Sequence, residues 1–158
     1  MIIDTSVIIA ILTNEPERGN FLDAIQGSTI NKMSAGSLIE LSAVITRKLG
    51  GDYAAVAETL LEEFGIGIEP VSTQQAWAGW QAYREYGIGT KSPAKLNFGD
   101  CFAYALAKES GEPLLFKGDD FTHTDIVPAL KPPPPHEDAA PAPADPQEIH
   151  PVVAHQRP

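Results

Sequence analysis

The sequence predicts an α/β domain of three layers, α/β/α, in which helices cover both faces of a mostly parallel central sheet. Short apolar runs typical of buried strands alternate along the chain with segments whose apolar residues recur every three or four positions. Gly and Pro residues separate these segments. Regular alternation of strands and helices is typical of a parallel sheet, because each parallel strand needs a long crossover connection. With 158 residues, the chain is long enough for one such domain.

The expected strands are short and lead into polar or glycine-containing segments. We expect them over residues 1–4, 28–32, 66–71 and 113–116. The expected helices are bounded by capping residues, Pro and Gly. We expect them over residues 7–12, 16–25, 35–49, 53–64, 73–86 and 98–108. The candidate N-caps are Thr5 or Ser6 for the first helix, Ser34 for the third and Asp52 for the fourth.

Two features of the helices have a structural interpretation. Trp77, Trp80 and Tyr83 follow one another at helical spacing in the segment 73–86, and we predict that they pack in the core rather than stack on nucleic-acid bases. Cys101 is the one cysteine, and we predict a small buried hydrophobic residue rather than a nucleophile. A single cysteine also excludes an internal disulfide framework and a multi-cysteine zinc site.

The end of the chain differs in composition from the rest. Nine of the 14 prolines fall within residues 131–158, together with many alanines. Such a segment buries too little apolar surface to offset the entropy of ordering it. We therefore expect a folded domain over residues 1–130 and a disordered Pro/Ala-rich tail over residues 131–158.

The charge balance excludes binding of nucleic acid through a broad basic face. The chain has 21 Asp and Glu against 11 Lys and Arg, a net charge of −10. The tail accounts for two of these units, because residues 1–130 hold 17 acidic and 9 basic residues. No apolar run approaches the roughly 20 residues needed to cross a bilayer. The chain opens without a leader pattern, so we expect a cytoplasmic protein that does not associate with membranes.

Several carboxylates occupy positions that ordinary surface charges seldom occupy. Asp4 follows the first expected strand, and Asp119 and Asp120 follow the last. In a parallel sheet both loops lie at the carboxyl ends of the strands, where ligands bind. Asp100 lies in the first turn of its helix, and Glu40 lies in an apolar helical run, where a carboxylate needs a partner. Each acid alone could cap a helix or a turn, but together they point to one end of the sheet.

Carboxylates gathered in one crevice favour a bound cation, because like charges raise one another's pKa. Carboxylate oxygens are ligands for Mg²⁺ and also suit Mn²⁺. A metal held by a few carboxylates retains water molecules, one of which can attack a phosphodiester while the cation offsets the developing charge. The residues therefore favour metal-assisted hydrolysis of a phosphodiester.

The four acidic segments resemble those of the PIN-domain ribonucleases. The resemblance is carried by four stretches in the family's order: residues 1–10 (MIIDTSVIIA), 33–40 (MSAGSLIE), 96–107 (LNFGDCFAYALA) and 113–121 (PLLFKGDDF). The match covers residues 1–127, and the small size is similar to that of VapC toxins of type II toxin–antitoxin modules. The resemblance implies a PIN-like α/β/α fold and a Mg²⁺-dependent endoribonuclease that is inhibited by a cognate VapB-type antitoxin.

The resemblance also implies roles for individual residues. Asp4, Glu40, Asp100 and Asp119 would form the catalytic acidic quartet, with Asp4 and Asp100 as direct metal ligands. Glu40 and Asp119 would complete the metal shell, hold a second metal or orient the water. Asp120 is the second candidate for the fourth acid, and Thr5 or Ser6 is expected to hydrogen-bond near the metal. Lys117 departs from the family pattern, in which Thr or Ser is common.

Other residues are candidates for binding the substrate or a partner. Lys91, Lys95 and Lys117 flank the acidic segments, and Arg84 precedes the loop that carries the first two. These four are candidates for contacting RNA phosphates, and Ser6 is a further candidate for binding the substrate. The helices of residues 34–49 and 52–65 carry apolar residues beyond one core stripe, which predicts a surface for a homodimer or for the antitoxin.

Two other functions are compatible with acids at strand ends. One is a catalytically weak module that acts mainly as the antitoxin's partner in a promoter-binding complex. The other is a receiver-like or haloacid-dehalogenase-like phosphotransfer domain. Receiver chemistry does not require Glu40, and dehalogenase-like phosphatases need an Asp where this chain has Ser6.

Overall fold

The fold is built on a four-stranded sheet in which all strands are parallel. The computed structural model describes residues 1–131, so the tail predicted to be disordered lies, apart from Lys131, outside the described residues. The strand order is β3-β2-β1-β4. The strands are β1 (Ile2–Ile3), β2 (Asn31–Ser34), β3 (Ile66–Glu69) and β4 (Leu114–Leu115). The parallel sheet that the sequence predicts is therefore confirmed.

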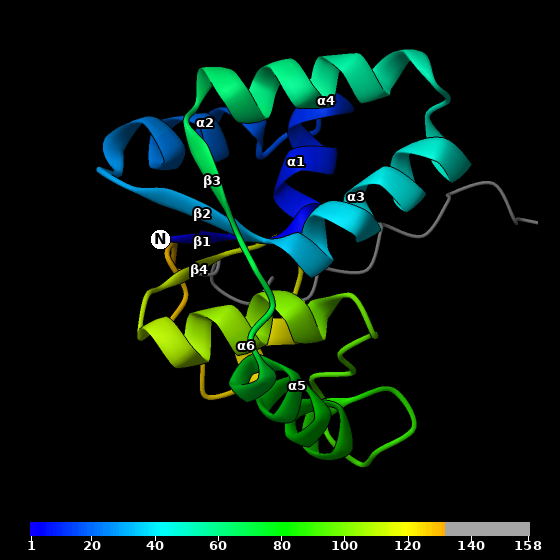
Figure 1. Ribbon diagram of the computed structural model, residues 1–158, viewed down its shortest axis with the longest axis vertical. Helices are drawn as coiled ribbons and strands as arrows, with labels where there is room; N and C mark the ends of the chain where they lie inside the picture. The colour runs from blue at the N-terminus through cyan, green and yellow to red at the C-terminus, as the bar shows by residue number, and fades with distance from the viewer. Residues whose placement is uncertain (132–158) are drawn as a thin grey trace, which may run out of the picture.

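Six α-helices cover the sheet in two layers (Figure 1). They are α1 (Thr5–Leu12), α2 (Arg18–Gly27), α3 (Ala35–Lys48), α4 (Asp52–Glu63), α5 (Thr73–Tyr86) and α6 (Asp100–Ser110), and a 3₁₀ turn, η1 (Asp120–His123), follows β4. Helices α1 to α4 lie on one side of the sheet, and α6 lies on the other, with α5 packed outside it. The predicted three-layer α/β/α architecture is confirmed.

Strands β1 and β4 alternate their side chains between two hydrophobic cores. Ile3 and Leu115 pack into the core beneath α1 to α4, whereas Ile2 and Leu114 pack into the core beneath α6. All four side chains are at most 1% exposed. Strands buried on both faces are continuously apolar, which is why two- to four-residue runs identify β1 and β4 in the sequence.

Four helix starts differ from the sequence-based expectation, and one of them is that of α2, which begins at Arg18 rather than at residue 16. Helix α1 begins at Thr5 and is capped by Asp4, whose carboxylate accepts the Ser6 N–H, so the caps proposed at Thr5 or Ser6 are wrong. Asp52 is the first helical residue of α4 and does not cap it. Helix α6 begins at Asp100 rather than Phe98. The predicted cap at Ser34 is confirmed.

The aromatic residues of α5 are not in the core, so that prediction is wrong. Trp77 and Trp80 are 63% and 62% exposed, and Tyr83 is 42% exposed. The face of α5 that meets α6 instead carries small or polar residues, including Gly79 and Ala82. A Cβ at position 79 would lie 3.3 Å from the Cys101 carbonyl oxygen, so a small residue is what allows the two helices to approach closely. The aromatic stripe therefore faces outward.

No helix among residues 1–131 is both long and apolar enough to span a membrane.

Candidate metal centre

Asp4 is the most buried carboxylate of the site. It follows β1 directly, and its backbone N–H continues the sheet pairing by donating to the Leu115 carbonyl oxygen at 2.9 Å. Oδ2 accepts hydrogen bonds from the Ser6 N–H at 2.9 Å and the Ser6 hydroxyl at 2.6 Å. Oδ1 is buried and has no hydrogen-bond partner among the described residues. Burial, followed by smaller contributions that include the charge of Asp120, raises the pKa of Asp4 above its ordinary value.

Ser6 connects Asp4 to the loop after β4. Its hydroxyl donates to Asp4 and accepts the Lys117 backbone N–H at 2.9 Å. The single hydroxyl therefore fixes the Asp4 carboxylate and ties together two loops at the carboxyl end of the sheet. This makes Ser6 a positioning residue for Asp4 in this structure.

Asp100 is held at the start of α6 by a reciprocal hydrogen-bond pair. Its Oδ2 accepts the Asn97 N–H at 2.6 Å, while Asn97 Oδ1 accepts the N–H groups of Gly99 and Asp100 at 2.6 and 3.1 Å. This arrangement resembles a capping box, which satisfies exposed N–H groups at a helix start. Asp100 is 7% exposed. Burial and the charge of Asp4 raise the pKa of Asp100 to about 7.

Glu40 reaches the site from α3 and contacts both of the other helices. Its Oε2 lies 2.9 Å from the Thr5 hydroxyl at the start of α1. A Cβ at position 99 would lie 1.8 Å from Oε1, so only Gly99 leaves room for the carboxylate beside the start of α6. Burial, and to a smaller extent the charge of Asp4, raises the pKa of Glu40. Glu40 therefore belongs to the same cluster as Asp4 and Asp100.

The two acids after β4 are placed differently. The negative charge of Asp120 acts on both Asp4 and Asp100, and burial together with Asp119 raises the pKa of Asp120 itself. Asp119 is exposed and precedes η1, where its carbonyl oxygen accepts the Thr122 N–H and hydroxyl at 3.0 and 2.6 Å. Both acids are exposed, and of the two it is Asp120 whose negative charge raises the pKa of Asp4 and Asp100.

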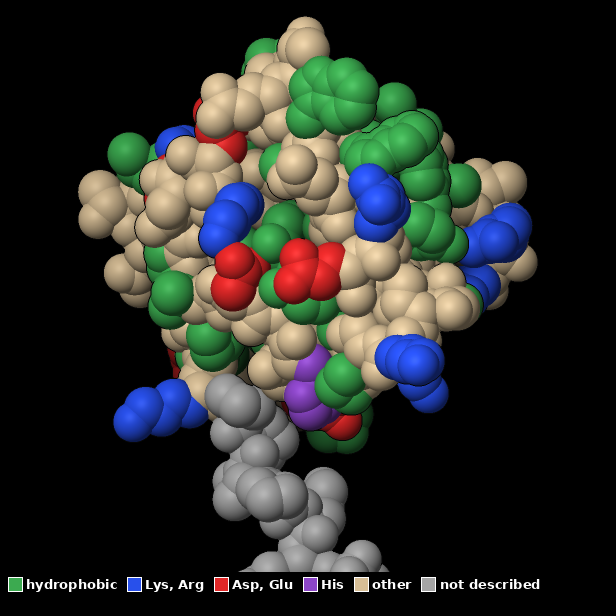
Figure 2. Space-filling view, turned by 90° about the horizontal axis from the view of Figure 1, so that it is seen from below, with side chains coloured by type: hydrophobic (Ala, Val, Ile, Leu, Met, Phe, Trp, Pro, Cys, Tyr) green, Lys and Arg blue, Asp and Glu red, His purple; other side chains and the backbone are tan. Residues whose placement is uncertain are grey.

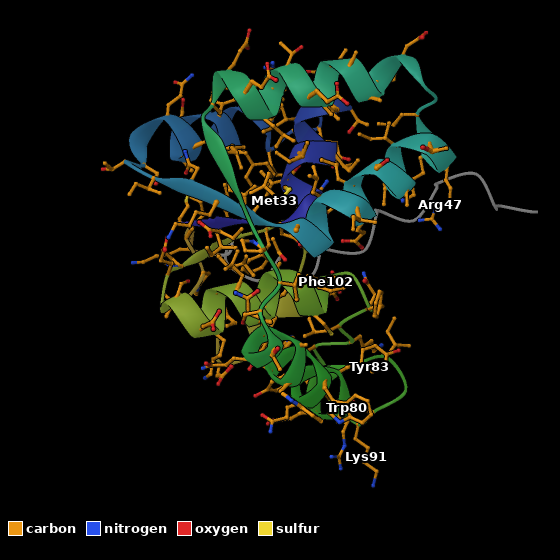
Figure 3. The ribbon with its side chains drawn as sticks, viewed as in Figure 1. Met33, Arg47, Trp80, Tyr83, Lys91 and Phe102 are labelled. Atoms are coloured by element: carbon orange, nitrogen blue, oxygen red, sulfur yellow. The ribbon has the colours of Figure 1, made fainter. Side chains whose placement is uncertain are left out.

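The three lysines proposed to hold RNA have different surroundings. The Lys117 ammonium pairs with Glu15 and also lies 3.4 Å from Glu17, so it is engaged within the domain. Lys95 is exposed, and its charge lowers the pKa of Asp120, which places it beside the cluster. Lys91 is exposed in the loop after α5 and lies at the far end of the molecule from the sheet (Figure 3).

The cluster fits a divalent cation that keeps part of its water shell. The buried Asp4 Oδ1 needs a partner, and no hydrogen-bond donor among the described residues occupies it, so it is free to bind a cation. Among residues 1–131, no three His, Cys, Asp or Glu side chains enclose a metal by themselves. Mg²⁺ commonly binds through one or two carboxylates and several waters, so a closed cage is not required.

Comparison with known proteins identifies the family. The PIN domain model matches residues 1–127. Ribonuclease VapC42 of Mycobacterium tuberculosis is 46% identical over 129 residues, which cover 82% of this chain and 98% of that protein. The chain belongs to the PIN-domain family. Within it, the chain is a VapC-type member, because a second relative, Ribonuclease VapC28 of M. tuberculosis, is 42% identical over 130 residues and covers 82% of this chain and 98% of that protein.

Solved structures show the same PIN fold. The structure of M. tuberculosis VapC20, described as a toxin that cleaves the sarcin–ricin loop, matches with a TM-score of 0.66. It covers 83% of this chain and 98% of that one at 17% identity. A toxin–antitoxin complex from Klebsiella pneumoniae matches with a TM-score of 0.57 at 17% identity, and covers 82% and 98% of the two chains.

Some contacts of this PIN domain were not anticipated from the sequence. The reciprocal bonds between Asn97 and Asp100 could have been found from their spacing of three residues, which is that of a capping box. The links from Thr5 to Glu40 and from Ser6 to Lys117 join residues far apart in the chain. No local pattern in the sequence signals such contacts.

The raised pKa of Asp100 predicts that the metal-free PIN domain loses stability as the pH rises. The folded state holds a proton on Asp100 up to about pH 7, whereas an unfolded Asp releases it near pH 4. Between these values the folded state binds more protons, so the free energy of unfolding falls with increasing pH. The pKa values of Asp4 and Glu40 are also raised, so these two groups lower the free energy of unfolding with increasing pH in the same way.

We expect the melting temperature in EDTA to fall by a few degrees more between pH 5 and pH 8 for the wild type than for Asp100→Asn. Asn keeps the oxygen that accepts the Asn97 N–H but does not titrate. Asp23→Asn, at an exposed position on α2, is the matched control and should follow the wild type. Equal pH slopes for the wild type and Asp100→Asn would contradict the assignment.

Proposed function

We propose that the chain is a metal-dependent endoribonuclease toxin that hydrolyses RNA phosphodiester bonds and uses Mg²⁺, with Mn²⁺ as a substitute. The observation that carries the proposal is the unpartnered, buried Oδ1 of Asp4 at the centre of a cluster formed with Glu40, Asp100 and Asp120. Support also comes from relatives named ribonucleases that are 42–46% identical over almost their full length. A cytoplasmic location, where cellular RNA is found, is part of the same proposal.

The residues of the cluster have distinct roles in this proposal. Asp4 and Asp100 hold the cation directly, since each uses one oxygen for a structural hydrogen bond and keeps the other for a ligand. Glu40 and Asp120 complete the shell or orient a water by accepting its proton. When bound, the metal supplies a water of lowered pKa and offsets the charge of the phosphodiester. Ser6 and Thr5 keep the Asp4 and Glu40 carboxylates in position.

Lys95 is the proposed contact for an RNA phosphate near the cluster, because it is exposed and its charge is felt at Asp120. Lys91 is a candidate for a phosphate farther along the strand. Lys117 is a weaker candidate, since Glu15 and Glu17 already neutralise its charge. The acidic domain therefore meets RNA through a few local cations rather than a broad basic face.

The proposed inhibitor is a VapB-type antitoxin that docks in a groove between α3 and α4. The groove has a volume of about 450 Å³ and an apolar floor that includes Leu41, Ile45 and Leu61. Glu58 and Glu62 lie at its exposed edge. A segment with apolar side chains flanked by Lys or Arg fits this combination. The related toxin–antitoxin complex from K. pneumoniae supports a partner of this kind.

A homodimer is a separate proposal, which rests on the apolar residues that α3 and α4 carry beyond their core-facing stripes. Light scattering on the purified chain gives its mass directly. A second copy in the α3–α4 groove is the alternative occupant to the antitoxin.

Removing either direct ligand should abolish cleavage. We expect Asp4→Asn and Asp100→Asn each to lower Mg²⁺-dependent cleavage of single-stranded RNA by at least about 100-fold, more than an outer-shell change usually does. Both variants should also relieve growth arrest on expression. Asp23→Asn removes the same charge from the exposed face of α2 and should remain active. A fully active Asp4→Asn or Asp100→Asn variant would refute the metal site.

The neighbouring acids Asp119 and Asp120 provide a matched pair in the same assay. Asp120→Asn should reduce cleavage more than Asp119→Asn, because the charge of Asp120 acts on Asp4 and Asp100. A larger loss of cleavage in Asp119→Asn than in Asp120→Asn would make Asp119 the fourth acid of the cluster.

Reversing the charge at the groove should weaken antitoxin binding. We expect the double variant Glu58→Lys/Glu62→Lys to associate about 10-fold more slowly with a cognate VapB-type antitoxin. Surface plasmon resonance measures the rate, and Asp23→Lys is the control for net charge. An unchanged association rate would place the antitoxin elsewhere.

A further inference from the structure

An exposed aromatic surface lies on the α5 side of the molecule. Trp77, Trp80 and Tyr83 are 63%, 62% and 42% exposed, and Phe98, in the segment before α6, is 74% exposed. Seen from below, hydrophobic side chains gather beside Lys and Arg side chains at this end of the domain (Figure 2). Clustered apolar groups of this size on a surface mark a binding site.

This surface surrounds a pocket of about 510 Å³ between α5 and α6, which we call the aromatic pocket. Trp80, Tyr83 and Arg84 line it from α5, and Phe98 and Phe102 line it from the other side. The rings of Phe98 and Phe102 meet edge to face, with centroids 5.1 Å apart. The pocket thus offers flat aromatic walls and one cationic group, and no carboxylate lines it among the described residues.

The aromatic pocket adjoins the acidic cluster through the start of α6. Phe98 comes two residues before Asp100, and Cys101 and Phe102 come directly after it. The same helix start therefore presents Asp100 to the cluster and three residues to the pocket. The cluster and the pocket thus share the start of α6.

The charge around the aromatic pocket favours an anionic ligand. In this chain of net charge −10, Lys32, Lys108 and Lys117 are neutralised by ion pairs. Arg84, Lys91 and Lys95 form no ion pair within residues 1–131. The same is true of Arg18, Arg47 and Lys48 on the helices of the other layer. Arg84, Lys91 and Lys95, by contrast, all lie in one segment, 84–95, that begins at the pocket. Trp80, Tyr83 and Lys91 lie at the same end of the molecule (Figure 3). At the other end of the segment 84–95, the positive charge of Lys95 lowers the pKa of Asp120.

We propose that the aromatic pocket binds an unpaired nucleobase of the RNA adjacent to the cleaved phosphodiester. The base stacks on Trp80 and Tyr83, and Arg84 and Lys91 contact the phosphates beside it. An aromatic ring attached to an anionic backbone matches flat apolar walls next to unpaired cations. This inference rests on the proposed ribonuclease function. It means that side chains of α5 contribute to the choice of which RNA is bound.

The test measures binding separately from cleavage. A fluorescein-labelled single-stranded RNA of mixed sequence is titrated with the full chain in EDTA, so that no metal-dependent cleavage occurs. We expect Trp80→Ala and Tyr83→Ala to weaken binding about 5- to 100-fold, the usual range for losing a stacked base. Trp80→Phe, which keeps an aromatic face, should restore most of the affinity. Tyr53→Ala, at a similarly exposed tyrosine of α4, should bind as the wild type does.

With Mg²⁺ present, the two pocket variants should raise KM and leave kcat within a few-fold of the wild type. Binding and KM equal to those of Tyr53→Ala would overturn the proposal, even if Asp100→Asn abolishes cleavage and the ribonuclease function stands. Conversely, pocket-dependent binding by a wild type that cleaves no RNA would support the pocket and refute the function. Light scattering measures the mass of each variant in solution. If binding is lost only in variants whose mass is half that of the wild type, this face binds a second copy of the chain, and the proposal is overturned.

Discussion

The burial of several carboxylates at one end of a parallel sheet is the constraint on which the rest of the structure depends. Asp4 caps α1 with one oxygen and leaves the other buried without a partner. Other carboxylates raise the pKa of Asp4 and Asp100, whereas Arg47 and Lys95 act on Glu40 and Asp120. The fold therefore carries an unfavourable electrostatic energy that a divalent cation would remove. Ser6, Thr5 and Asn97 hold the carboxylates in place rather than neutralise them.

The distribution of cations follows from the same constraint. A strongly acidic chain gains little long-range attraction for RNA, so under the proposed function contacts close to the cluster supply the affinity. Lys95 stands beside Asp120, and Arg84 lines the aromatic pocket. Stacking on aromatic side chains adds affinity that does not depend on net charge. The acidic composition and a nucleic-acid substrate are compatible for this reason.

The sequence predicts the fold well because β1 and β4 are short, apolar and buried on both faces, and because helices alternate with the strands along the chain. It also predicts which loops meet, so Asp4 at a strand end and Asp100 at a helix start lie together, and Glu40 joins them from the second turn of α3. It does not decide between Asp119 and Asp120, since adjacent residues in a turn point in directions that only the loop geometry sets. It misplaces Trp77 and Trp80, because α5 packs on α6 through small residues such as Gly79, and that leaves the aromatic stripe outside.

The central claim is that Asp4 holds a divalent cation, and direct binding of Mn²⁺ tests it. Electron paramagnetic resonance measures free Mn²⁺ during titration of the full chain at pH 8, where Asp100, with a pKa of about 7, is mostly ionised. The account predicts a saturable site in the wild type that Asp4→Asn weakens by at least about 10-fold, whereas Asp23→Asn leaves it unchanged. Equal Mn²⁺ affinity in the wild type and Asp4→Asn would contradict it.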